Sequence, residues 1–175
     1  MKKTLVLLVC GFLASPVSAW EIEKTTDAMT DEVSRTVFVD SNDGSRFTLI
    51  RKSDNSVWGY LKLSGMNQFM INERLLLRVD KSEPVKFNED FEKLTVELGM
   101  KVESWEWNPN LIGFRLWHGK LDEGCGLVQK LYDGEKMVIR YHPNQSTIKD
   151  VHFDISKNKS VITDSLEINM DNCRK

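Results

Sequence analysis

The sequence predicts a mainly β protein, a single domain folded as an antiparallel β-sandwich or a barrel-like sheet with two or three short helices. Short runs of β-branched, aromatic and aliphatic residues recur along the chain, and clusters of Asp, Asn, Ser and Gly separate them. Helical spacing of apolar residues occurs only in brief stretches. No repeat, low-complexity tract or proline-rich linker divides the chain, so we expect one β-rich domain over residues 20–175.

The first nineteen residues have the pattern of an export signal. Lys2 and Lys3 precede an apolar run over residues 5–13, and small side chains stand just before the end of the segment. Signal peptidase is therefore expected to cut between Ala19 and Trp20 and to leave the domain in the periplasm or, after further transport, outside the cell. The apolar run is shorter than the roughly 20 residues of a membrane-spanning helix, so no stable membrane insertion is expected.

Charge argues against two classes of partner. The chain carries 24 basic and 26 acidic residues, and removal of Lys2 and Lys3 leaves 22 basic ones, with both signs interspersed along the whole length. Nucleic acids and anionic lipids bind mainly to clustered Lys and Arg. Neither nucleic acid nor a lipid surface is therefore an expected partner.

The cysteine count indicates one disulfide. Cys10 leaves with the export signal, and Cys125 and Cys173 remain as an even number in an oxidising compartment. We expect them to pair and to tie the C-terminus to the body of the domain, with two buried free thiols as the alternative. A zinc site is a poorer interpretation because no histidine stands at ligand spacing from either cysteine.

Four strands are predicted in the first half of the chain. They cover residues 36–39, 47–51, 57–63 and 69–79. Residues 41–45 and 52–56 are predicted to be hairpin loops, because Asn, Asp and Gly tolerate the positive φ that such reversals need. Residues 21–34 are polar, turn-rich and without a period, so no regular element is expected there.

The fourth of these strands has two distinct faces. Leu75, Leu77 and Val79 share one face, and Arg74 and Arg78 fall on the other, as in a half-buried antiparallel strand. We therefore consider the two arginines candidate residues for contact with a partner.

The middle of the chain leaves two alternatives open. Residues 83–110 fit a short helix and strands equally well. Further along, alternation predicts strands over residues 136–141 and 151–155, and residues 142–144 are expected to form a turn.

Helical spacing occurs in two places. Residues 122–132 are predicted to form a short helix, which Asp133 and Gly134 end. The last stretch is expected to be a helix that presents an apolar stripe and carries Cys173 towards Cys125. Three apolar residues four positions apart make this stripe: Ile162, Leu166 and Met170.

A search for reaction chemistry finds no catalytic constellation. His118, His142 and His152 have no partner at the spacing of a metal motif, so no metal site is expected. No Gly-x-Ser-x-Gly elbow occurs, and the glycine-containing run over residues 119–126 lacks the Lys and Ser or Thr of a phosphate loop. We therefore expect neither a cofactor nor an enzymatic activity.

A carboxylate pair is the one enzymatic alternative that stays open. Cleavage of a glycan or of peptidoglycan needs two Asp or Glu side chains across a cleft. Four acidic residues stand near tryptophans in the sequence and are the candidates: Glu103, Glu106, Asp122 and Glu123. Solvated surface charges are the simpler interpretation of these residues.

Tryptophans are the strongest candidates for contact with a partner. Trp105 and Trp107 flank one residue, and Trp117 follows nearby. Tryptophan rings offer a large contact area at low entropic cost, which suits both sugars and proteins as partners. Because Trp105 and Trp107 would share one face of an alternating strand, packing in a sandwich core is the alternative interpretation.

Five groups of short motifs occur in a fixed order over about 150 residues. They are Trp20 with Asp27-Ala28-Met29-Thr30-Asp31; the strand over residues 47–52; the strand end Arg78-Val79-Asp80; Leu116-Trp117-His118-Gly119 with the helix and strand that follow up to Pro143; and Phe153-Asp154-Ile155-Ser156. In this order and wording the chain resembles the VasI/TagO family of exported proteins associated with type VI secretion systems of Gram-negative bacteria.

The resemblance implies an envelope accessory protein without an agreed catalytic residue or cofactor. Two positions depart from the family pattern: Ala28 stands where the family has proline, and Lys52 stands where relatives carry a cysteine that would bond the C-terminal one. The expected function is thus that of a periplasmic, non-enzymatic binding protein whose partner is an envelope or secretion-system protein. The alternatives are a small glycan or peptidoglycan hydrolase, and a phage or mobile-element protein that blocks a receptor or inhibits an enzyme.

Overall fold

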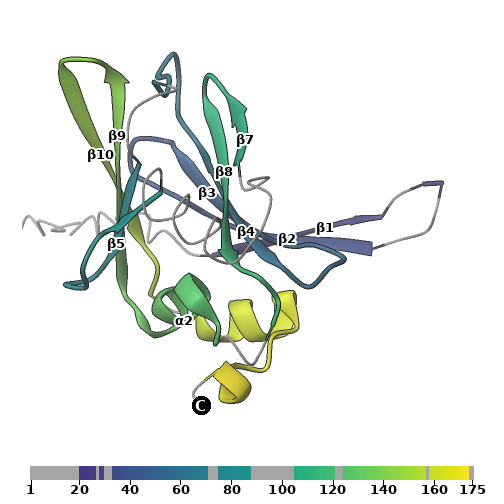
Figure 1. Ribbon diagram of the computed structural model, residues 1–175. Helices are drawn as coiled ribbons and strands as arrows, with labels where there is room; N and C mark the ends of the chain where they lie inside the picture. The colour runs from purple at the N-terminus through teal and green to yellow at the C-terminus, as the bar shows by residue number, and fades with distance from the viewer. Residues whose placement is uncertain are drawn as a thin grey trace, which may run out of the picture.

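Two antiparallel sheets make up most of the structure, a computed structural model that describes residues 20–26, 28–29, 33–70, 75–87, 105–120, 124–156 and 158–173. The six-stranded sheet has the order β1-β2-β3-β4-β8-β7, and the four-stranded sheet has the order β10-β9-β5-β6 (Figure 1). The fold is therefore mainly β, as predicted. Because both sheets are open, it is the predicted sandwich and not the barrel-like alternative.

The strands of the six-stranded sheet are β1 (Glu21–Thr26), β2 (Val33–Asp40), β3 (Arg46–Arg51), β4 (Val57–Lys62), β8 (Leu111–Trp117) and β7 (Trp105–Asn108). Those of the four-stranded sheet are β10 (Thr147–Asp154), β9 (Lys136–Asn144), β5 (Leu76–Val79) and β6 (Val85–Lys86).

One hydrophobic core lies between the two sheets. Phe47 and Leu49 of β3 are fully buried, because alternate residues of this strand point into the sandwich. The ring of Phe47 lies 5.9 Å, between centroids, from the ring of Phe153 in the other sheet. Gly59 makes room for this ring, since a Cβ on Gly59 would lie 3.0 Å from it. The period-2 pattern thus becomes a packed interface between two sheets.

The two predicted hairpin loops share the same hydrogen bond and the same backbone conformation. In the turn over residues 41–45, the Ser45 N–H donates to Asp43 Oδ1 over 2.9 Å, and in the turn over residues 52–56 the Ser56 N–H donates to Asp54 Oδ1 over 2.9 Å. The residue after each aspartate has a positive φ, 82° at Gly44 and 67° at Asn55. Asp-Gly-Ser and Asp-Asn-Ser therefore suit the same reversal.

Four predictions need correction. β1 occupies residues for which no regular element was predicted; all six of its side chains are exposed, so it has no apolar alternation. β8 was not predicted. In the stretch over residues 69–79 only β5 is a strand, and residues 71–74 lie outside the description. Residues 142–144, predicted to be a turn, instead belong to β9.

The helices lie where they were predicted, but the C-terminal one is divided into two short turns. Helix α2 (Gly126–Asp133) lies within one residue of the predicted C-terminal boundary. At the C-terminus, the π-helical turn η2 (Val161–Ser165) and the 3-10 turn η3 (Met170–Cys173) replace one continuous helix. Glu167, with a φ of 53°, separates them. The predicted apolar stripe is nevertheless confirmed, because Ile162, Leu166 and Met170 are all buried.

Candidate functional site

One end of the sandwich, here called the disulfide end, comprises α2, η2, η3 and the turn over residues 52–56. The predicted bond between Cys125 and Cys173 is present there and joins positions 48 residues apart. Both cysteines are buried. The bond fixes the C-terminal turns beside the start of α2, which is the structural role that the sequence predicted.

Side-chain hydrogen bonds add to this attachment. The Arg51 guanidinium donates to the carbonyl oxygens of Leu166 and Glu167, over 2.9 Å each, where the C-terminal helical turn ends. The amide of Asn158, which is buried, donates to the carbonyl of Leu131 in α2. Several separate segments therefore hold the last residues of the chain in place.

Trp20, the residue that follows the predicted cleavage site, is part of the core. Its side chain is 9% exposed, and its indole N–H donates to the carbonyl of Ile155 over 3.3 Å. Ala19 and the residues before it lie outside the described part of the chain.

Trp117 has a structural position. It is buried, and its indole N–H donates to the carbonyls of Lys120 (3.2 Å) and Gly124 (2.7 Å), on the path towards Cys125. Trp58 is also buried, and its indole N–H donates to the Ser56 hydroxyl over 3.1 Å. Of the tryptophans whose side chains are described, none presents a ring face for a sugar or a partner.

The remaining tryptophans and the four acidic residues that were candidates for a site have side chains that the structure does not describe. Trp105 and Trp107 pair in register with Phe114 and Ile112, but their side chains are not described. The same holds for the side chain of Glu106, and Glu103, Asp122 and Glu123 lie entirely outside the described residues. The hydrolase alternative therefore gains no observation from the described part of the chain.

Lys52, at the position where the resembled family has a cysteine, packs over two aromatic rings. Its Nζ lies 5.6 Å from the ring centroid of Trp58 and 5.5 Å from that of Tyr60. The cation–π geometry accounts for a basic residue at this position.

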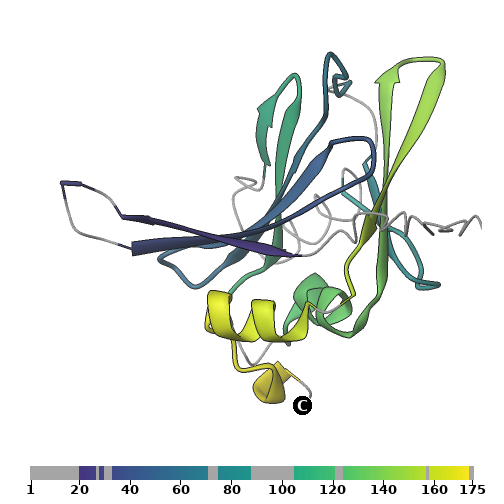
Figure 2. The same cartoon turned by 180° about the vertical axis from the view of Figure 1, so that it is seen from behind.

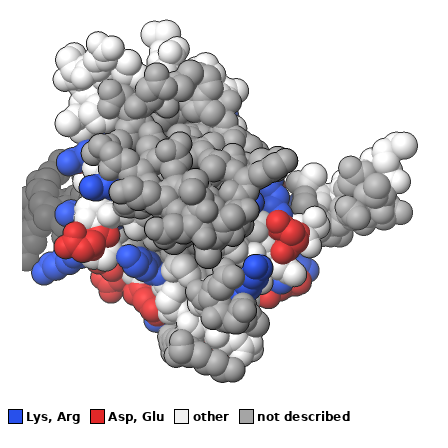
Figure 3. Space-filling model, in the orientation of Figure 1, with Lys and Arg blue, Asp and Glu red and all other residues white. Residues whose placement is uncertain are grey.

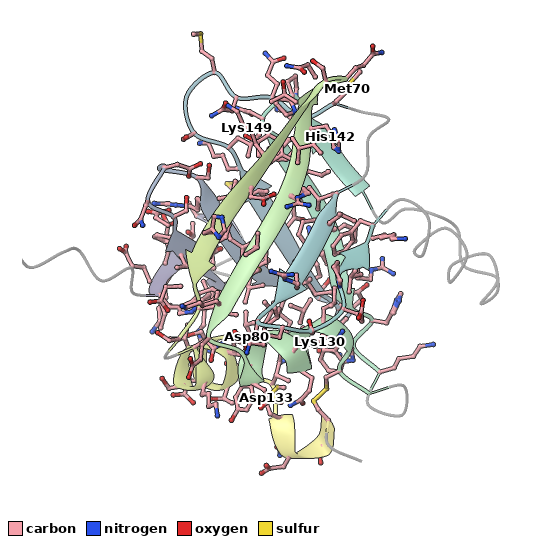
Figure 4. All side chains as sticks on the ribbon, turned by 90° about the vertical axis from the view of Figure 1, so that its left-hand side faces the viewer. Met70, Asp80, Lys130, Asp133, His142 and Lys149 are labelled. Carbon is pink, nitrogen blue, oxygen red and sulfur yellow. A yellow bond between two sulfur atoms is a disulfide. The ribbon has the colours of Figure 1, made fainter. Side chains whose placement is uncertain are left out.

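Asp80, at the strand end Arg78-Val79-Asp80, connects the end of β5 to the start of β9 and to the residue before it. Its carboxylate accepts hydrogen bonds from the Glu135 N–H (3.2 and 3.3 Å) and the Lys136 N–H (2.9 Å), and its own N–H donates to the Lys136 carbonyl. In Figure 4, Asp80, Lys130 and Asp133 lie together at this end. Gly134 is required by close packing, because a Cβ there would lie 2.2 Å from Val79 Cγ1. This motif is therefore structural.

The outer face of the four-stranded sheet is charged with both signs. Arg78 is exposed there and pairs in register with Val138, while Arg74 lies outside the described residues. The Arg140 guanidinium bonds both carboxylate oxygens of Asp150 (2.7 and 2.8 Å) and holds the pKa of Asp150 below its ordinary value, against the opposing effect of burial. In Figure 3, basic and acidic side chains are interspersed on the visible described surface.

The opposite end, here called the loop end, gathers four connections. They are the turn over residues 41–45, residues 63–70, the turn over residues 108–111 and the hairpin tip over residues 142–149. Main-chain bonds fix the second of these: Leu63 N–H donates to Asn110 O, and Met70 N–H donates to His142 O, each over 2.9 Å. Lys149 Nζ donates to Asn67 Oδ1 over 2.7 Å. Met70, His142 and Lys149 cluster at this end in Figure 4.

Two apolar side chains at the loop end face solvent. Met66 is 96% exposed and Ile148 is 57% exposed. Ile148 lies where the register between β9 and β10 shifts, a bulge that changes the direction of a side chain. A depression of about 470 Å³ adjoins Met66, and its lining includes Gly65 and the cross-strand neighbours Arg46 and Lys62. Two exposed apolar side chains thus lie at the loop end, beside a depression lined by charges of both signs, because Asp40 also lines it and is ion-paired with Arg46.

Sequence reasoning missed Met66 and Ile148. Each is a single large apolar residue in a polar stretch of sequence, Ser64-Gly65-Met66-Asn67 and Gln145-Ser146-Thr147-Ile148-Lys149. An isolated apolar residue in a turn was the available signal, but single exposed apolar residues are common on protein surfaces. Only the fold shows that the two lie at the same end.

The described residues contain no group of three His, Cys, Asp or Glu side chains that could hold a metal ion. His118 Nδ1 lies 3.2 Å from a guanidinium nitrogen of Arg115, and His142 and His152 belong to β9 and β10. Within the same part of the chain, no helix has the length and apolar character needed to span a membrane.

Comparison of this chain with protein-family models, with curated proteins and with solved structures finds no match.

Proposed function

We propose that this chain is an exported, non-enzymatic accessory protein of the cell envelope that binds another protein through its loop end. The observation that carries the proposal is the exposure of Met66, in the loop over residues 63–70, and of Ile148, at the start of β10, where hydrogen bonds hold the chain in place. Protein interfaces place apolar anchors at the centre and polar groups at the rim. Here Lys62 and Lys149 supply such a rim beside the two apolar side chains.

The chemistry of the loop end suits recognition of a protein surface. Methionine is flexible and polarizable, so it adapts to an apolar pocket of a partner. The surrounding loops are anchored by main-chain hydrogen bonds, which lowers the entropy lost when a partner binds. The partner surface that fits this end therefore offers apolar pockets for the two side chains and polar groups around them.

The export signal and the disulfide support the cellular location. Disulfides are typical of proteins that fold in oxidising compartments such as the periplasm, and Cys125 and Cys173 form one here. The resemblance to the VasI/TagO family supports a component of a type VI secretion system as the partner. In this proposal the protein itself performs no covalent chemistry.

Site-specific photocrosslinking in the producing cell tests the proposal. A benzoylphenylalanine placed at residue 66 or residue 148 should give one defined adduct with an envelope protein, which mass spectrometry identifies. The same group at exposed residue 53, in the turn at the disulfide end, should not give that adduct. Identical adducts at all three positions, or no adduct at residues 66 and 148, would contradict the proposal.

Charged substitutions provide a matched control. Met66→Glu and Ile148→Glu should each remove the adduct formed at the other position, because a carboxylate cannot enter an apolar pocket without loss of hydration. Met29→Glu makes the same change at a residue that is 93% exposed on a different element, and should leave the adduct unchanged. Normal type VI secretion in a deletion strain would remove the secretion-system assignment but not the binding activity.

A further inference from the structure

Strand β1 is an edge of the six-stranded sheet along its whole length. It pairs with β2 from Glu21 opposite Phe38 to Thr26 opposite Val33, and among the described residues no strand lies on its other side. Edge strands present main-chain groups to which another strand can add. In Figures 1 and 2, β1 starts beside the body of the sandwich, and its far end extends away from the body as an arm together with the start of β2.

The side chains of β1 are accessible on both faces. All six are exposed, and Ile22 is 48% exposed although it pairs with the fully buried Val37. Glu21 and Glu23 share the opposite face, where both interact electrostatically with the Arg46 guanidinium, whose hydrogen bonds go to Asp40. Among the described residues, the edge therefore combines main chain whose only strand partner is β2, one apolar side chain and two carboxylates that share one face.

Charge disfavours a second copy of the chain at this edge. Two identical antiparallel strands in one sheet are related by a two-fold axis perpendicular to the sheet, so residues of the same face stand opposite one another. Centring the axis on Glu23 opposes Glu23 to itself, and centring it on Lys24 opposes Lys24 to itself. Centring it on Ile22 opposes Glu21 to Glu23 twice. Directly opposed like charges destabilise a strand pair, so each of these registers is disfavoured.

A strand of another sequence, with basic residues, can pair with the exposed edge of β1 without opposed like charges. Basic residues two positions apart would lie opposite Glu21 and Glu23, and an apolar residue between them would lie opposite Ile22 on the other face. We propose that β1 binds an extended segment of another protein by strand addition, in an antiparallel register, and that the segment carries alternating basic residues. This site is separate from the loop end and does not depend on its function.

A synthetic peptide tests the proposal on the full chain. The probe is an acetylated and amidated eight-residue peptide in which lysine alternates with threonine or valine, and its control has glutamate in place of every lysine. Hydrogen exchange measured by NMR should slow at β1 amides when the lysine peptide is added, and the glutamate peptide should have no effect. The affinity should also fall as salt is raised.

Charge-reversal variants make the test specific. Glu21→Lys with Glu23→Lys should weaken binding of the lysine peptide by about tenfold or more, since two attractive cross-strand pairs become repulsive. The matched control is Glu83→Lys with Glu135→Lys, two exposed residues in turns of the other sheet, and it should bind as the parent does. Both variants are to be checked for unchanged melting temperature.

Three results would overturn the proposal. The first is no protection of β1 amides at millimolar lysine peptide, and the second is equal protection by both peptides. The third is a concentration-dependent dimer in which the β1 amides are protected without any peptide, because a second copy would then be the occupant.

Discussion

The two ends of the sandwich differ in how their connections are held, although both consist of turns between strands. At the disulfide end, one covalent bond and the side chains of Arg51, Asn158 and Asp80 fix α2 and the C-terminal turns. At the loop end, main-chain bonds and Lys149 support the connections, and Met66 and Ile148 remain in solvent. One end is thus fixed by a covalent bond and by side chains, and the other leaves two apolar side chains exposed, which is where we propose that a partner binds.

The hairpin turns show that the difference does not come from turn chemistry. Asp43 and Asp54 accept equivalent bonds in turns of equal length at opposite ends. What differs is the neighbourhood: Asn55, beside Asp54, accepts a bond from Arg51, which also holds the C-terminal turn. The distinction between the ends is therefore tertiary.

The largest expected effect is at the disulfide. Cys125→Ser with Cys173→Ser should lower the free energy of unfolding by about 4 kcal/mol, because the unfolded chain is no longer closed over 48 residues. Urea denaturation monitored by tryptophan fluorescence measures the change. An unchanged midpoint would mean that the disulfide end does not depend on its covalent bond.

A pair of glycine substitutions compares packing at the two ends. Gly134→Ala should cost about 2–3 kcal/mol, because its Cβ would meet Val79 Cγ1 at 2.2 Å and the Lys130 carbonyl at 2.9 Å. Gly65→Ala, at the loop end, has nothing within 4 Å of its Cβ and should cost only about 1 kcal/mol, for its φ of 60°. If thermal unfolding shows that the two substitutions lower stability equally, the proposed difference in packing between the two ends is contradicted.

Acid should lower the contribution to stability of both aspartate turns, the one over residues 41–45 and the one over residues 52–56. Bonds from the Ser56 hydroxyl and N–H lower the pKa of Asp54; burial raises the pKa of Asp43, but bonds from Ser41 and Ser45 outweigh it and the net shift is downward. A lowered folded-state pKa contributes stability above about pH 4, which is lost as the pH falls through the folded value. Asp54→Asn and Asp43→Asn should therefore each reduce the stability lost between pH 5 and pH 2. A variant that loses as much stability as the parent would show that its carboxylate is not bonded.

The smallest expected effect on stability is at the loop end. Met66→Glu and Ile148→Glu should change the free energy of unfolding by less than about 0.5 kcal/mol, because both side chains are already exposed. Calorimetry checks this, and it separates a loss of binding from a loss of folding. A decrease of 2 kcal/mol or more would show that these residues support the fold.

Local patterns predicted the elements that depend on local chemistry. The two aspartate turns, the strands around Phe47 and Val57, and the end of α2 at Gly134 follow from turn residues and alternation. β1 could not be predicted in this way, because an exposed edge strand needs no apolar face. The register of β7 against β8 is likewise set by the sheet and not by the sequence of either strand.

The candidate site was less predictable than the fold. Trp117 was a reasonable contact residue by composition, yet its indole N–H is used by two backbone carbonyls and its ring is in the core. Met66 and Ile148 are 82 residues apart in number and share a location only through the packing of four loops. The pairing of Cys125 with Cys173 was predictable because the predicted export signal contains Cys10, and without Cys10 only one pair of cysteines is possible.

The bond between Cys125 and Cys173 also makes a covalent ring that contains α2, β9 and β10. The exposed hairpin tip with Ile148 belongs to this ring. A protease that cuts the tip once therefore opens the ring but releases no fragment, and the nicked protein migrates as one species in a denaturing gel until the bond is reduced. The surface proposed for recognition thus tolerates a single cleavage without loss of the C-terminal segment.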